Sequence, residues 1–144
     1  MQHTTVGRGM WHSEINNLPD QPMRFIQMWF YPAEHGLEPS VEQNAIEKRD
    51  RTDRFLPLVS NRDQGALSIA ADARIFSSFL HAGKMEHYDL ATGRGIYLYV
   101  LEGGPITVSN VKVPLLGSAM ITAEKAIDVV AEQDAELLLV EVKK

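Results

Sequence analysis

The chain contains no cysteine, and this absence removes several classes of chemistry at once. Disulfide bonds, thiolate metal ligands, redox dithiols and cysteine nucleophiles are all excluded. The chain also has no apolar run long enough to cross a bilayer, and its first residues lack the apolar core of a secretory signal. We therefore expect a cytoplasmic protein that has no membrane partner.

The chain also lacks an excess of basic residues. The chain has 14 lysines and arginines against 19 aspartates and glutamates, which gives a formal net charge of −5. Proteins that bind DNA or RNA use basic surfaces to neutralise phosphates, so we expect no direct contact with nucleic acid. The 144 residues, of which 44% are hydrophobic, are enough for one globular domain with a buried core.

From residue 55 onward the chain is a series of short apolar segments separated by turn residues. Pro57 lies in the first segment, residues 55–60, and predicts an edge strand there because proline cannot donate a ladder hydrogen bond. Further strands are expected over residues 67–70, 73–80, 85–90, 96–102, 106–108, 111–113, 119–122, 126–131 and 136–142. A tight hairpin turn is expected at Ser109-Asn110. Short strands at this spacing predict a β-sandwich or a small barrel.

The N-terminal third of the chain has a different pattern. Residues 1–17 indicate two strands joined by a glycine-rich turn, and the aromatic run of residues 23–31 (MRFIQMWFY) predicts a mostly buried strand. Residues 33–54 are polar and rich in turn formers. Ser40 followed by Gln43 fits a capping box, so we expect a short helix to begin there.

His12 and Glu14 are the candidate metal ligands. They lie in the segment VGRGMWHSEIN, and alternate residues of a strand share a face. An imidazole and a carboxylate on one face are typical of a metal-binding pair. The alternative is a structural pair that hydrogen-bonds on the surface. His3 would supply a third ligand if it faced His12 across a hairpin; otherwise it is a surface histidine.

Several segments together resemble the pirin-like proteins of the cupin superfamily. The segments VGRGMWHSE, FIQMWFYP, GLEPSVEQ and SIAADARIF fit this family in order and spacing, as does IYLYVLEGGPITVSNVKVPLLGSAMIT. The resemblance implies a mostly β protein built on a cupin-type β-barrel or sandwich, the double-stranded β-helix, with extra N-terminal strands and a short helical connection. Residues 1–54 would be the end of an N-terminal cupin, and residues 55–144 a C-terminal cupin in the same compact unit.

The resemblance also implies that His12 and Glu14 are the second half of an iron site. Its first half is two histidines of an HPH-type strand, and no His-Pro-His occurs in this chain. A naturally short relative, a fragment and a misplaced gene start all agree with this pattern. The implied function is a binding or interaction module with an incomplete metal site. The alternative is an iron-dependent dioxygenase of the quercetin 2,3-dioxygenase type, whose site a dimer partner completes.

We expect the C-terminal cupin to be free of metal. The segment His87-Tyr88-Asp89 comes nearest to the His-x-His motif of cupins. Tyr97 and Met120 stand where the later glutamate and histidine ligands are expected. A phenol and a thioether are poor ligands for a hard divalent ion. His81 and His87 lie either side of a turn and could approach each other, but each is more typical of a solvated or hydrogen-bonded histidine.

Two further groups of residues leave alternatives open. Arg8 and Arg94 each lie in a Gly-Arg-Gly sequence, which suits either anion binding or a solvated turn, and we favour the turn. Four aromatic residues suit either a pocket for a small aromatic ligand or a core or interface; these are Trp11, Trp29, Phe30 and Tyr31. Apolar N-terminal strands without their sheet predict a homodimer formed through them.

Overall fold

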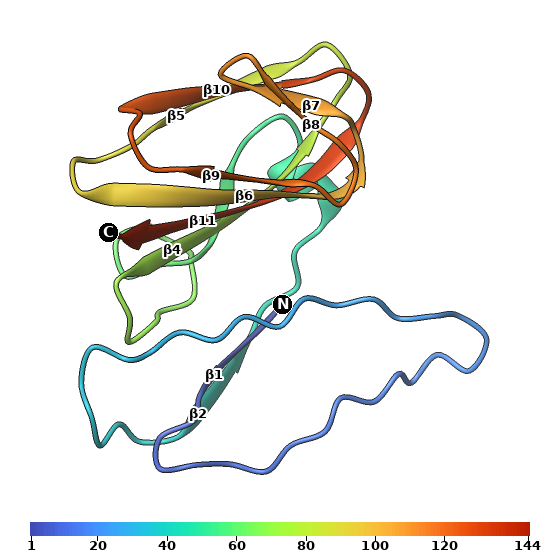
Figure 1. The fold of residues 1–144 in the computed structure, drawn as a ribbon. Coiled ribbons are helices and arrows are strands. Elements are labelled where there is room, and N and C mark those ends of the chain that lie inside the picture. Colours follow the sequence, from blue (N-terminus) through green and yellow to red (C-terminus); the bar gives the residue numbers. More distant parts are fainter.

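The structure is a computed structural model and describes residues 1–144. It consists of strands β1 to β11 and one short 3-10 helix, η1. Figure 1 shows two stacked sheets, with the ribbon β1–β2 and a long loop below them. The predicted mostly β sandwich is confirmed. No helix is long and apolar enough to cross a membrane.

The two sheets use the strands that the turn residues delimit, and every pairing within them is antiparallel. The larger sheet has the order β3 (Leu56–Val59), β4 (Ala73–Leu80), β11 (Ala135–Lys143), β6 (Arg94–Gly103) and β9 (Ser118–Ile121). The smaller sheet has the order β5 (Met85–Asp89), β10 (Ala126–Ala131), β7 (Ile106–Val108) and β8 (Val111–Val113).

Two local predictions of turn and edge chemistry are confirmed. Pro57 lies on β3, which is an edge strand of the larger sheet. Ser109 and Asn110 join β7 to β8, and their φ angles of 44° and 72° are those that a tight hairpin turn requires. Residues 67–70 depart from the prediction, because they form no strand and Leu67 makes only an isolated bridge to Val59.

Side chains that alternate along the strands fill the space between the sheets. The fully buried residues of this main core include Leu98, Val100, Val129, Leu137 and Leu139. The intervening residues of β11, Leu138 and Val140, belong to a second, smaller cluster on the outer face of the larger sheet. Because both faces of β11 are covered, the strand is an apolar run rather than an alternation of apolar and polar residues.

The N-terminal segment differs from the prediction. β1 (Gln2–Thr5) pairs with β2 (Ser40–Gln43), and residues 6–39 between them form a long loop without helix or strand. The strands expected in residues 6–17 and 23–31 are therefore wrong. Their backbone has no neighbouring strand to pair with, and a strand depends on such pairing.

The short helix lies later than predicted. Ser40 and Gln43 belong to β2, so the helix expected from their capping box is wrong at that position. It occurs instead as η1 (Lys48–Arg51), where Glu47 and Asp50 form a capping box. Pairing with β1 satisfies the backbone of Ser40–Gln43, and this outweighs the local capping preference.

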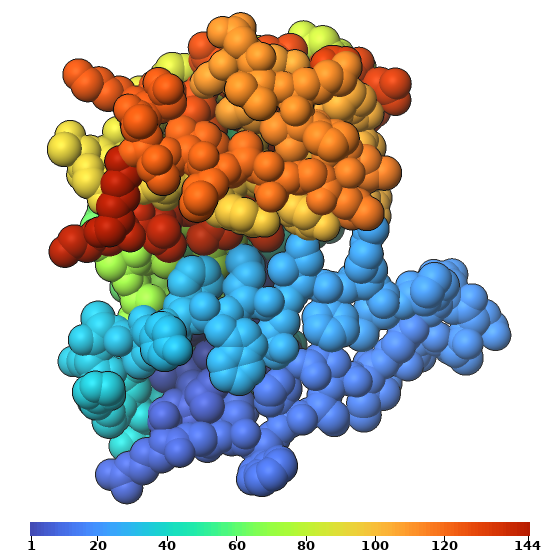
Figure 2. Space-filling view, viewed as in Figure 1, coloured from blue at the N-terminus to red at the C-terminus, as the bar shows by residue number.

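The N-terminal layer touches the sandwich at a few points. The amide of Ala33 donates to the Ala70 carbonyl over 2.7 Å, and Arg24 forms an ion pair with Glu102. Phe30 packs against the smaller apolar cluster. Figure 2 shows this blue layer beneath the compact sandwich. That residues 1–54 are the end of an N-terminal cupin stays a prediction.

Candidate functional site

His12 and Glu14 meet on the long loop. His12 Nε2 lies 3.1 Å from Glu14 Oε1. Gln27, from the returning arm of the loop, places its amide Nε2 at 3.3 Å from Glu14 Oε1 and 3.4 Å from His12 Nε2. Sequence reasoning missed Gln27, although a lone amide inside an aromatic and apolar run was the available signal.

The geometry of this pair fits two neighbouring positions around a metal ion. Metal–ligand bonds of about 2.1 Å at right angles place two ligand atoms about 3 Å apart, close to the observed separation. In its present orientation Gln27 turns a donor N–H toward the pair, which suits a carboxylate better than a cation. No group of three or more histidine, aspartate or glutamate side chains in the chain is arranged to hold a metal ion. One chain thus brings together one imidazole and one carboxylate here, at a separation that also fits a hydrogen-bonded pair.

His3 does not join this pair. In the β1–β2 ribbon it lies opposite Glu42, and its Nδ1 is 3.8 Å from Glu42 Oε2. Of the two alternatives for His3, a ligand that faces His12 across a hairpin is wrong, because β1 pairs with β2 rather than with residues just after the glycine turn.

His81 and His87 each contact carboxylates instead of one another. His81 Nδ1 lies 3.1 Å from Asp53 Oδ2. His87 Nδ1 lies 2.6 Å from Asp128 Oδ1, and its Nε2 lies 3.2 Å from Asp89 Oδ1. The hydrogen bond to Asp128 is the main reason why the pKa of His87 is raised. These contacts agree with the interpretation of both residues as hydrogen-bonded histidines.

The inward-facing polar residue on β5 is Glu86, which sequence reasoning missed. Glu86 is 5% exposed, whereas its neighbour His87 faces outward. The Ser78 hydroxyl donates to Glu86 Oε1 over 2.5 Å, and Glu86 Oε2 is buried without a hydrogen-bond partner in the protein. Burial raises the pKa of Glu86 to about 7, and the nearby Asp53 adds to this effect. The alternation of residues 85–90 was the signal that places Glu86 on the face of Tyr88.

Tyr97 and Met120 lie outside the barrel. They are cross-strand neighbours on β6 and β9, and both are exposed. The prediction that they occupy interior ligand positions is wrong. The interior face of β6 is instead apolar, with Ile96, Leu98 and Val100.

Arg94 is buried rather than solvated, so the favoured interpretation of its Gly-Arg-Gly sequence is wrong. Arg94 begins β6 and is 5% exposed, and its Nε donates to Glu141 Oε1 over 2.6 Å. Glu141, which is 1% exposed, also accepts from Arg74 Nη1 over 3.2 Å. Asp63 holds Arg74 through two bonds of 2.8 and 2.9 Å, and Asp72 holds Arg94. This cluster is a structural ion-pair network inside one end of the sandwich.

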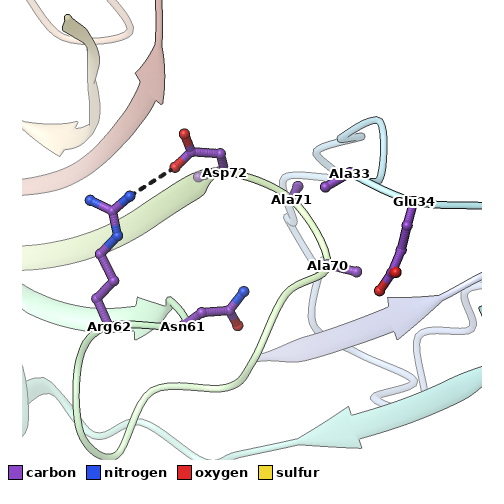
Figure 3. A pocket seen from close by; sticks show the side chains of 8 residues that line it. Ala33, Glu34, Asn61, Arg62, Ala70, Ala71 and Asp72 are labelled. Atoms are coloured by element: carbon purple, nitrogen blue, oxygen red, sulfur yellow. Dashed lines mark hydrogen bonds and ion pairs between the residues drawn. The ribbon is translucent and has the colours of Figure 1, made fainter.

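A pocket of about 380 Å³ lies between the N-terminal layer and the sandwich (Figure 3). Arg62 and Asp72 pair across 3.3 Å on one side of it, and Glu34 lies on the other side. Asn61 accepts from the Ile69 amide over 2.8 Å. Arg62 and Asn61 are thus engaged within the protein, and the remaining wall is mostly alanine.

Comparison with known proteins decides the family. A family model described as the quercetinase C-terminal cupin domain matches residues 58–142. The chain belongs to the pirin-like cupin family. The match runs from within β3 to within β11, so it covers nearly all of the sandwich.

Individual relatives agree with this membership. A pirin-like protein of Caulobacter vibrioides is 35% identical over 143 residues, covering 98% of this chain and 61% of that protein. A quercetin 2,3-dioxygenase of Escherichia coli is 27% identical over 138 residues, covering 96% of this chain and 58% of that protein. The chain thus spans about three fifths of the length of these curated relatives. The crystal structure of the bacterial pirin YhhW from Escherichia coli in complex with nickel(II) superposes with a TM-score of 0.69 at 25% identity. The superposition covers 78% of this chain and 47% of the YhhW chain.

Proposed function

We propose that this pirin-like chain acts as a binding or interaction module rather than as a dioxygenase complete within one chain. The observation that supports the proposal is the donor set at His12 and Glu14. Mononuclear iron of the 2-His-1-carboxylate type needs three protein ligands. The chain brings together one histidine and one carboxylate, and the third side chain at the pair is the amide of Gln27.

His12 and Glu14 are the residues that would hold a metal ion. A divalent iron bound there would supply Lewis-acid activation of a substrate oxygen. In this proposal the imidazole of His12 acts as a ligand, and Glu14 acts as a ligand or as a base. The amide of Gln27 orients the Glu14 carboxylate by donating to it.

The second candidate function is an iron-dependent dioxygenase of the quercetin 2,3-dioxygenase type whose site is completed by a partner. The name of the Escherichia coli relative favours it. The exposed aromatic side chains of Trp11, Trp29 and Tyr31 on the same loop also favour it, because large exposed apolar groups are typical of interaction sites. We propose a second copy of the chain as the partner, in a symmetric dimer.

The metal content of the purified full chain tests the first proposal. We expect less than one equivalent of iron per chain by elemental analysis, and no consumption of quercetin above the rate without protein. Stoichiometric iron that is lost in His12→Ala and kept in His35→Ala would overturn the proposal. His35 is a suitable control because it is an exposed histidine on the same loop.

Light scattering after size exclusion tests the dimer. We expect a dimer at micromolar concentration that dissociates in Trp29→Ser. A monomer in the unchanged chain would contradict the partner-completed site. The binding-module proposal would then be tested by the metal measurement alone.

A further inference from the structure

A second cavity, of about 390 Å³, opens at the edge of the sandwich. It lies between β5, an edge strand of the smaller sheet, and the residues just before β3, an edge strand of the larger sheet. Phe55, Phe76 and Tyr88 form its apolar wall, and Glu86 lies among them. None of these residues belongs to the loop that carries His12 and Glu14.

Glu86 is the unusual group in this cavity. Ser78 occupies one oxygen of its carboxyl group, and the other oxygen, Oε2, has no protein donor although it is buried. A buried carboxyl oxygen without a donor is costly when the group is ionised. A ligand that donates a hydrogen bond and carries positive charge removes this cost.

The aromatic wall suits the same kind of ligand. Tyr88 packs edge-on against Phe76, with ring centroids 5.2 Å apart, and against Phe55 at 5.9 Å. Aromatic faces attract ammonium groups, and the rings also bury an attached apolar body. A carboxyl group among three aromatic rings is therefore suited to a cation with an organic substituent.

The charged groups around the cavity leave Glu86 as the free acceptor. The Arg54 side chain donates to the Asp50 carbonyl over 2.6 Å, and His87 is held by Asp128 and Asp89. Asp53 is bound by the His81 amide over 2.9 Å, and this hydrogen bond lowers the pKa of Asp53. Both cationic side chains at the rim thus have acceptors already, and Lys84 is the further cation near Asp53.

We propose that this cavity is a binding site for a small organic ammonium ion, with Glu86 as its counter-ion and the aromatic wall around its body. The site goes beyond the proposed function and is independent of it. Binding favours the ionised carboxylate, so the Glu86 proton passes to the buffer when the complex forms below neutral pH. Affinity therefore rises with pH through neutrality.

Calorimetric titration of the full chain with 2-phenylethylamine tests the site, and 2-phenylethanol serves as the neutral probe of the same shape. We expect the amine to bind at least tenfold more tightly than the alcohol. We also expect proton release at pH 6, measured as a dependence of the heat on the buffer's ionisation enthalpy. Equal affinity for the two probes, or no binding of the amine, would overturn the proposal.

Substitutions locate the binding to Glu86. Glu86→Gln should weaken binding of the amine at least tenfold. Glu132→Gln, at an exposed glutamate, should leave the affinity for the amine unchanged. If Glu86→Gln does not fold, the carboxyl resonance of Glu86 in the unchanged chain replaces it, and the amine should lower the pKa of Glu86. An unaltered pKa under saturating amine would contradict the proposal. His12→Ala should retain amine binding, which separates this result from the metal test.

Discussion

The hydroxyl of Tyr88 donates a hydrogen bond of 2.5 Å to the carboxylate of Glu141, and this contact joins the two sheets across the interior of the sandwich. Tyr88 lies on β5 of the smaller sheet and Glu141 on β11 of the larger sheet. Burial raises the pKa of Tyr88, and the hydrogen bond and negative charge of Glu141 raise it further. Arg94 and Arg74 supply the positive charge that a buried carboxylate needs.

Removal of the Glu141 carboxylate should therefore destabilise the folded protein. We expect Glu141→Ala to lower the free energy of unfolding by about 3–5 kcal/mol, because two arginines then lose a buried partner. Urea denaturation followed by circular dichroism measures the change. Glu132→Ala is the matched control: it breaks an exposed pair with Lys112 and should cost less than about 1 kcal/mol. Similar losses in both variants would contradict the role of burial.

Stability should depend on pH through Glu86. Its pKa is raised to about 7 in the folded protein, so the folded state binds a proton more tightly than the unfolded chain. This contribution is complete below about pH 4.5 and is lost as the pH rises through 7. The free energy of unfolding of Glu86→Gln, compared with that of the unchanged chain, should therefore rise by about 2–3 kcal/mol between pH 5 and pH 8. Denaturant titrations at both values check this, and a constant difference would refute it.

Gly103 should not tolerate a side chain. A Cβ atom there would lie 1.9 Å from the Asp134 carbonyl oxygen, and the residue has a φ of 68°. We expect Gly103→Ala to lower the melting temperature far more than Gly93→Ala. Gly93 has a similar φ of 80° but open space around its Cβ position, so only the backbone strain of about 1–2 kcal/mol applies to it. Equal shifts in a thermal melt would show that the close approach does not matter.

The Glu14 carboxylate should be the main determinant of the loop's affinity for metal ions. We expect Glu14→Gln to weaken nickel(II) binding by about tenfold or more, since a neutral amide replaces a charged ligand. Nickel titration by calorimetry measures this. Glu34→Gln changes a glutamate elsewhere on the same loop and should leave the affinity unchanged. Binding that survives Glu14→Gln would place the nickel elsewhere.

The strands from residue 73 onward could be predicted from the sequence because each is delimited by local turn chemistry. Asn110 tolerates a positive φ in the turn after β7, and residues 85–90 alternate. Residues 23–31 have the same aromatic and apolar composition as a strand but form none. Strand pairing depends on a neighbour that is distant in sequence, and composition does not supply that neighbour.

By itself the sequence determined the mostly β sandwich and the pirin-like family, because these depend on local pattern. The sequence also singled out His12 and Glu14, but it expected them on a strand and they meet on a loop. Only the tertiary structure decided that Gln27 joins this pair, that Arg94 is buried against Glu141, and that Glu86 faces an aromatic cavity. The contacts of Gln27 and Arg94 join residues 13 to 47 positions apart, and the cavity of Glu86 combines three separate segments of the chain. Local pattern does not say which of these segments will meet. Such a meeting follows from the packing of the two sheets and the N-terminal layer.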